Sequence, residues 1–184
     1  RAVRVCTDEA SAGKDSAEFV ARNLDGAIQA KGHANLILAT GASQFAFIET
    51  LKTLQVDWSK ITVFHLDEYK DLPETHPASF RKYLKERILD SVKPFQVHYI
   101  NGDAKDIDRE IARYEELLKA VTVDVACIGI GENGHIAFND PEVADFNDPA
   151  LVKIVQLDDT SRRQQLGEGW FATLEEVPRE AISL

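Results

Sequence analysis

The sequence contains no methionine and only two cysteines, Cys6 and Cys127, among its 184 residues. The two cysteines form no C-x-x-C spacing, so the sequence predicts neither a disulfide framework nor a structural zinc site. Two isolated thiols suit a reducing compartment. Because even an initiator methionine is missing, we expect an excised fragment, a processed chain or a sequence from which modified methionines are absent.

Long apolar runs are also missing. No run approaches the roughly 20 residues that a membrane-spanning helix needs, and no apolar h-region of a secretory signal peptide follows the charged first residues. Basic residues are in deficit, with 21 Lys and Arg against 31 Asp and Glu, a net charge of −10. Such a charge repels nucleic-acid backbones and anionic membrane surfaces. We therefore expect a cytoplasmic protein that binds neither nucleic acid nor a membrane.

The composition that remains, 44% hydrophobic and 28% charged, is that of an ordinary globular protein and excludes collagen-like and wholly disordered chains. The length fits one compact domain over residues 1–184. Residues 178–184, PREAISL, have the pattern of the approach to another strand. We therefore expect the domain to be truncated at its C-terminus.

Apolar residues recur every three to four positions in several segments, and this spacing predicts amphipathic helices. These segments are residues 17–28, 45–51, 80–88 and 107–118. Short, nearly continuous apolar runs lie between them and are typical of strands buried on both faces. These runs are residues 3–5, 36–39, 61–66, 97–100, 123–130 and 151–157. Alternating strands and helices indicate an α/β fold, an open and mostly parallel sheet with helices on both faces in three layers.

Parallel sheets bind ligands at the carboxyl ends of their strands, so the loops that follow strands are the candidate sites. The first such loop is Thr40, Gly41, Ala42 and Ser43, which leads into a helix. A small-residue turn at a helix N-terminus exposes backbone N–H groups to an anion. It matches neither a P-loop nor a nucleophile elbow. An ordinary strand-to-helix turn explains it equally well.

The second loop begins with Asp67 and Glu68, two adjacent carboxylates at the end of a buried strand. Burial of such groups is costly unless they are paired or used in chemistry. For an isolated pair, a capping or salt-bridged acid is the favoured interpretation.

The third loop, residues 129–141 with the sequence GIGENGHIAFNDP, is the most informative. Its glycines let the backbone approach a ligand closely. His135 lies in this loop together with Asp140, and with Asp67 these side chains can form an acid–base set. The histidines show no H-E-x-x-H spacing, and the zinc signature of base deaminases is absent, so we predict no metal site.

Together these motifs resemble the glucosamine-6-phosphate deaminase family, within the wider group that also contains 6-phosphogluconolactonases. The resemblance covers almost the whole chain, and the 129–141 segment is its most specific part. It implies a Rossmann-like open sheet, conversion of glucosamine 6-phosphate to fructose 6-phosphate and ammonia, and no cofactor or metal. The implied partner is a small sugar phosphate. The resemblance also leaves a homo-oligomeric state possible, because members of the family range from monomers to hexamers.

The resemblance also implies roles for individual residues. Asp67 becomes the base that moves a proton between C2 and C1 of the opened sugar, and His135 becomes the catalyst of ring opening, supported by Asn133 and Asp140. Thr40, Gly41, Ala42 and Ser43 meet the substrate phosphate, and Glu68 joins them at the substrate.

The chain departs from the family pattern in several places. Asn133 stands where many members have Asp, and an amide cannot ionise, although it can orient a ring. Asp140 replaces a Glu that is longer by one methylene. We assign the family's phosphate-binding arginine to Arg162, because the ungapped position is Leu166 and only Arg162 and Arg163 lie near it. A phosphate-binding lysine of the family lies beyond residue 184. The segment RRQQLGEGWF, residues 162–171, has no match among the best-known deaminases.

Two alternatives stay open. A 6-phosphogluconolactonase shares the fold and a related histidine loop, but typically has D-E-R where this chain has D-E-Y. A non-catalytic sugar-phosphate sensor usually loses the catalytic carboxylate, whereas Asp67 and His135 are both present here. The deaminase is therefore favoured.

Overall fold

A four-stranded parallel sheet forms the centre of the computed structural model, which describes residues 2–184. Its strands run in the order β4-β2-β1-β5. They are β1 (Ala34–Leu38), β2 (Ile61–His65), β4 (Gln96–His98) and β5 (Val125–Ala126). Each neighbouring pair is parallel, so the predicted α/β fold with a parallel sheet is confirmed.

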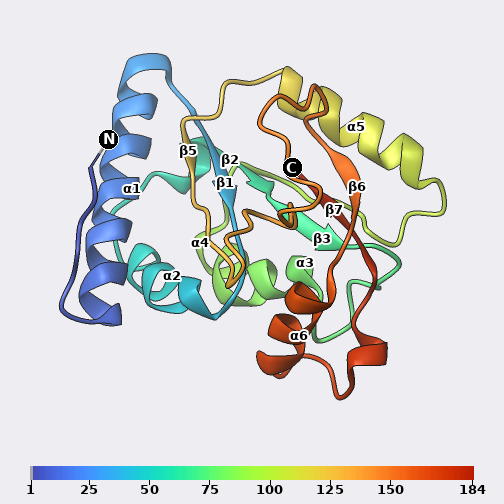
Figure 1. Cartoon of the computed structure of the whole chain (residues 1–184). Helices are drawn as coiled ribbons and strands as arrows, with labels where there is room; N and C mark the ends of the chain where they lie inside the picture. Colours follow the sequence, from blue (N-terminus) through green and yellow to red (C-terminus); the bar gives the residue numbers. More distant parts are fainter. Residues whose placement is uncertain (1) are drawn as a thin grey trace.

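Helices cover both faces of this sheet, as Figure 1 shows. On one face lie α1 (Glu9–Lys31), α2 (Phe45–Leu51), and α3 (Phe80–Leu84), which continues through a π-helical turn (Lys85–Leu89) into α4 (Asp90–Val92). On the other lies α5 (Ile107–Lys119). Leu36 and Leu38 of β1 face the α1 side and Ile37 faces the α5 side, because successive side chains of a strand alternate. This two-sided burial explains the continuous apolar runs.

A second sheet lies beside the first and is antiparallel, with the order β3-β7-β6. It consists of β3 (Asp67–Tyr69), β6 (Lys153–Gln156) and β7 (Glu180–Ser183). The run at 151–157 therefore forms a strand, but not one of the parallel sheet. The chain passes from β2 to β3 across the single residue Leu66, so Asp67 stands at the junction of the two sheets.

Two predicted strands are wrong in whole or in part. Residues 3–5 form no strand: Val3 and Val5 are 94% and 93% exposed, and the segment runs along α1, where Arg4 is paired with Asp15 (Figure 1). An apolar run without a neighbouring strand has no partner for its backbone hydrogen bonds. The run at 123–130 is a strand only over Val125–Ala126, because its backbone then leaves β1 and enters the glycine-rich loop.

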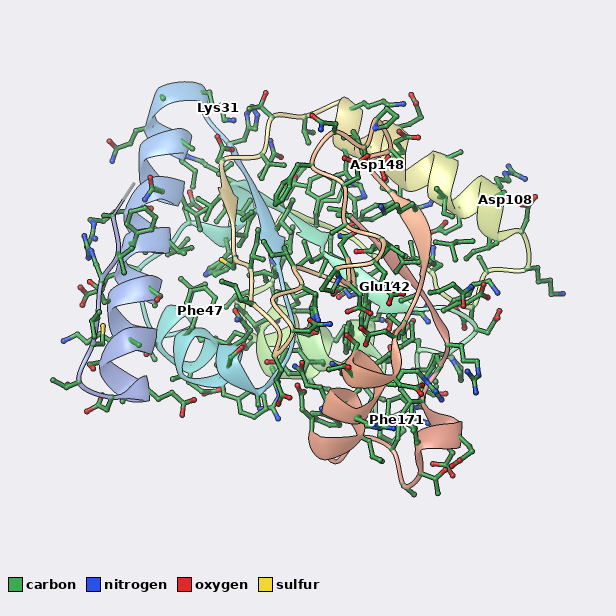
Figure 2. The ribbon with its side chains drawn as sticks, viewed as in Figure 1. Lys31, Phe47, Asp108, Glu142, Asp148 and Phe171 are labelled. Atoms are coloured by element: carbon green, nitrogen blue, oxygen red, sulfur yellow. The ribbon has the colours of Figure 1, made fainter. Side chains whose placement is uncertain are left out.

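Helix α6 (Asp159–Gly167) and the segment after it close one end of the second sheet. The ring of Phe171, labelled in Figure 2, packs edge-on against Tyr69 of β3 with 5.5 Å between centroids. Phe80 and Phe138 pack on the same tyrosine. This aromatic cluster holds α6 close to the point where β2 passes into β3. Short 3-10 turns at Ala42–Gln44, Trp58–Lys60 and Leu174–Glu176 complete the elements. No helix within residues 2–184 is long and apolar enough to cross a membrane.

Candidate active site

A cavity of about 170 Å³ lies at the carboxyl edge of the parallel sheet, where the three predicted loops meet. Six predicted site residues line it: Thr40, Gly41, Ala42, Ser43, Asp67 and His135. Its remaining wall includes Gln164, Gln165 and Glu168 from α6 and its C-terminal end. A larger hollow of about 560 Å³ lies between α1 and β5, but it shares only Ser43 with the predicted site. The smaller cavity is therefore the candidate active site, because the acid–base residues face it.

Asp67 is the buried acid of this cavity, a residue only 6% exposed. Its Oδ1 atom has no hydrogen-bond partner in residues 2–184. Burial, and then the neighbouring charge of Glu68, raises the pKa of Asp67 to about 8. A carboxyl group with a pKa in this range is suited to accept and return a proton near neutral pH.

His135 reaches the same cavity and packs tightly against Gly131. A Cβ atom added to Gly131 would lie 2.1 Å from Cε1 of the imidazole, so only glycine fits there. Nδ1 of the ring lies 2.6 Å from Oδ1 of Asn133 and 3.2 Å from Oδ1 of Asp140. Both oxygens accept hydrogen bonds, which places the proton of the neutral ring on Nδ1. Nε2, with no hydrogen bond recorded to residues 2–184, is then the basic nitrogen.

Asp140 lies behind His135 and not on the cavity wall. Burial acts to raise its pKa, but hydrogen bonds from Ser161, from the backbone N–H of Asp158 and from Asn133 outweigh burial and lower the pKa. The Ser161 hydroxyl donates to Oδ1 of Asp140 and also lies 3.2 Å from Nδ1 of His135. An ionised carboxylate held in this way stabilises a histidinium formed during proton transfer.

The turn after β1 adopts a conformation that requires glycine at position 41, where φ is +104°. The Tyr83 hydroxyl donates to the carbonyl of Gly41 over 2.9 Å and fixes the turn. The backbone N–H groups of residues 41–43 have no acceptor among the described residues. A turn with several open N–H groups is suited to bind an anion.

The structure does not bring Glu68 and Arg162 into the cavity. Glu68 is fully buried and accepts hydrogen bonds from the backbone N–H groups of Phe80 and Arg81 and from the Arg81 guanidinium. Arg162 is 2% exposed and donates to the carbonyl of Val177 over 3.1 Å and to that of Leu174. Glu68 therefore joins β3 to α3, and Arg162 joins α6 to the 174–177 segment. The structure supports substrate contact for neither.

Sequence analysis also missed several residues of this site: Ser161, Gln164, Gln165 and Glu168. All four belong to α6 or directly follow it, and three of them, Gln164, Gln165 and Glu168, lie in the 162–171 segment that matched no well-known deaminase. One signal was present, since Asp158 followed three residues later by Ser161 is a helix-start pattern. The Asp158 side chain does accept the N–H of Ser161 over 2.6 Å. Within residues 2–184 no group of His, Cys, Asp and Glu side chains is arranged to hold a metal ion.

The fold and the cavity define an α/β protein with an acid–base site at the edge of a parallel sheet. The family model for glucosamine-6-phosphate isomerases/6-phosphogluconolactonase matches residues 7–161, and the chain belongs to this family. The resemblance noted in the sequence is thereby confirmed.

The relatives include proteins described as glucosamine-6-phosphate deaminase. The one from Exiguobacterium sp. is 39% identical over 147 residues, which is 80% of this chain and 56% of that protein. The one from Bacillus cereus is 35% identical over 172 residues, 93% of this chain and 63% of the relative. The chain thus spans about three fifths of the length of these curated relatives.

Solved structures agree on the fold. A monomeric glucosamine-6-phosphate deaminase superposes with a TM-score of 0.86 and 27% identity, over 97% of this chain and 73% of that chain. A 6-phosphogluconolactonase from Shewanella baltica gives a TM-score of 0.77 at 18% identity, over 96% and 71% of the two chains. At that identity the second structure supports the fold alone.

Proposed function

We propose that the protein converts glucosamine 6-phosphate and water to fructose 6-phosphate and ammonia. The observation that carries this proposal is the position of Asp67, whose buried Oδ1 has no hydrogen-bond partner among residues 2–184 and which lines the same cavity as His135. An aldose–ketose shift needs a base beside the carbon acid and a separate group that opens the sugar ring. Asp67 and His135 supply these two groups.

The reaction begins with ring opening. Nε2 of His135 accepts the proton of the C1 hydroxyl and delivers it to the ring oxygen as the bond between that oxygen and C1 breaks. Asn133 and Asp140 hold the ring in the required tautomer through Nδ1. His135 ends this step in its starting protonation state.

Asp67 then carries out the isomerisation. Its carboxylate removes the proton from C2 of the open chain while one proton of the ammonium group passes to O1, which gives an enolamine. Asp67 then returns its proton to C1, so that C1 becomes a hydroxymethyl group and C2 a protonated imine. Water adds to the imine, and ammonia leaves to give the ketose. Throughout, the phosphate group is held by the turn at Thr40, Gly41, Ala42 and Ser43, in which the N–H groups of residues 41–43 are open to an anion.

The test is to incubate the protein with glucosamine 6-phosphate and to follow ammonia and fructose 6-phosphate together. Equal release of both products supports the proposal. Hydrolysis of 6-phosphogluconolactone in a parallel assay, without ammonia release, would assign the protein to the hydrolase branch of the family. Sugar-phosphate binding measured by calorimetry, with no turnover of either compound, would make the protein a sensor.

A further inference from the structure

Glu168 is the second acidic side chain on the cavity wall and has no part in the chemistry described above. It is half-buried and follows the last residue of α6, where its backbone N–H donates to the carbonyl of Gln164 over 3.1 Å. Within residues 2–184 its carboxylate makes no recorded hydrogen bond or ion pair. Of the two arginines of α6, Arg162 donates to backbone carbonyls, and Arg163 lines with Glu168 a separate hollow that does not include Asp67 or His135.

The position is electrostatically unfavourable for an acid. The C-terminal end of a helix carries partial negative charge and favours cations, so an unpaired carboxylate there opposes the helix dipole. The charge of Glu168 also acts on the interior of the protein. The pKa of the buried Tyr69 is raised first by burial and second by the charge of Glu168. Glu168 therefore lies close enough to the interior of the site for its charge to act on Tyr69, and its carboxylate has no recorded ion pair within residues 2–184.

The cavity has two chemically different ends. The turn at residues 41–43 offers N–H donors to an anion, whereas Asp67 and Glu168 offer carboxyl oxygens. No lysine or arginine of the described chain lines the cavity. A ligand that carries a phosphate at one end and a positive charge at the other is complementary to this arrangement.

We propose that Glu168 binds the ammonium group of the substrate and selects amino-sugar phosphates over sugar phosphates without an amine. This inference rests on the proposed function and adds a specificity residue to it. A phosphorylated lactone, the ketose product and an N-acylated amino sugar all lack the cation. Each of them leaves Glu168 desolvated and unpaired, which penalises binding.

The experiment measures, by calorimetry, how the wild-type chain and Glu168→Gln bind two ligands, glucosamine 6-phosphate and fructose 6-phosphate. Glutamine keeps the shape and removes the charge. We expect an about 10-fold loss of affinity for the amino sugar, as one charge-assisted hydrogen bond requires, and no loss for the ketose. In turnover, KM rises and kcat is largely kept, because the ammonium is bound in the ground state as well as the transition state.

Glu132→Gln is the matched control, because Glu132 is an exposed glutamate of the neighbouring loop that does not line the cavity. It should leave both affinities unchanged. An equal loss for both ligands in Glu168→Gln, or no loss for either, overturns the role of Glu168 even if the wild-type chain releases ammonia. A wild-type chain that binds neither ligand overturns the proposed function and this inference with it.

Discussion

Oδ1 of Asn133 lies 2.6 Å from Nδ1 of His135 and also accepts the backbone N–H of that histidine over 3.1 Å. The other end of the amide, Nδ2, donates to carboxylate oxygens of Asp140 and Asp158 over 3.0 and 3.3 Å. An amide suits this position because it presents an acceptor to the imidazole and a donor to two acids. Asn133, which departs from the family pattern, therefore suits the presence of Asp158, the N-cap of α6, because its amide can donate a hydrogen bond to that carboxylate.

Asn133→Asp should destabilise the protein, because the new carboxylate would face two others and has no donor to offer them. The expected loss is about 1–3 kcal/mol in the free energy of unfolding, measured by denaturant titration near neutral pH. Adding Asp158→Asn should recover part of the loss, since this second change restores a donor. If Asn133→Asp alone were as stable as the wild type, the proposed pairing of Asn133 with Asp158 would be contradicted.

Gly131→Ala should displace the imidazole of His135, because the added Cβ overlaps the ring. Overpacking of this kind costs about 1–3 kcal/mol of stability, and we expect turnover to fall as well. Gly26→Ala serves as the control, since Gly26 lies on the exposed side of α1 with nothing within 4 Å of the added atom. It should raise stability by up to about 1 kcal/mol and leave turnover unchanged. Normal activity in Gly131→Ala would show that the ring position is unimportant.

His135→Gln should impair the ring-opening step by about 10²- to 10⁴-fold, the usual contribution of an acid–base group. A substrate analogue locked in the open-chain form needs no ring opening, so its conversion should be affected far less. Steady-state kinetics on the cyclic and open forms make the comparison. Equal losses on both substrates would remove this role from His135.

Asp67→Asn should stabilise the protein in alkaline solution. Burial raises the pKa of Asp67 to about 8 in the folded state, whereas an unfolded Asp has a pKa of about 3.9. Between these values the folded state binds a proton that the unfolded chain has released, so wild-type stability falls as pH rises from about 4 to about 8. The variant lacks this group, and its advantage should grow across the same window to more than about 1 kcal/mol at pH 8. Parallel stability curves for the two proteins would contradict the buried, protonated state of Asp67.

The sequence predicted the three loops correctly because their placement follows from one rule. Parallel strands end at the same edge of a sheet, so the turns after β1, β2 and β5 had to converge. Residues whose role depends on the direction in which the side chain packs were harder to predict from the sequence. Arg162 lies close to the expected position in the sequence, yet its guanidinium turns toward the carbonyls of residues 174–177. The sequence pattern does not specify which side of α6 faces the cavity.

The α6 wall could not be predicted for a further reason. Gln165 reaches the site because Tyr69 of β3 donates its hydroxyl to the Gln165 side chain over 2.7 Å, a contact between residues far apart in the sequence. Antiparallel pairing of β3 with β7 and of β7 with β6 places this end of the chain beside the parallel sheet. Local apolar patterns indicate that the run at 151–157 is a strand, but they do not indicate its partner.

The role of Asp67 as the base is tested by comparing ammonia release from glucosamine 6-phosphate by the wild-type chain and by Asp67→Asn, with fructose 6-phosphate binding measured on both. The variant keeps the shape of the cavity and removes the base. We expect ammonia and fructose 6-phosphate in equal amounts from the wild type, no release from the variant, and similar binding by both proteins. Near-normal ammonia release by Asp67→Asn would contradict the assignment of Asp67 as the base.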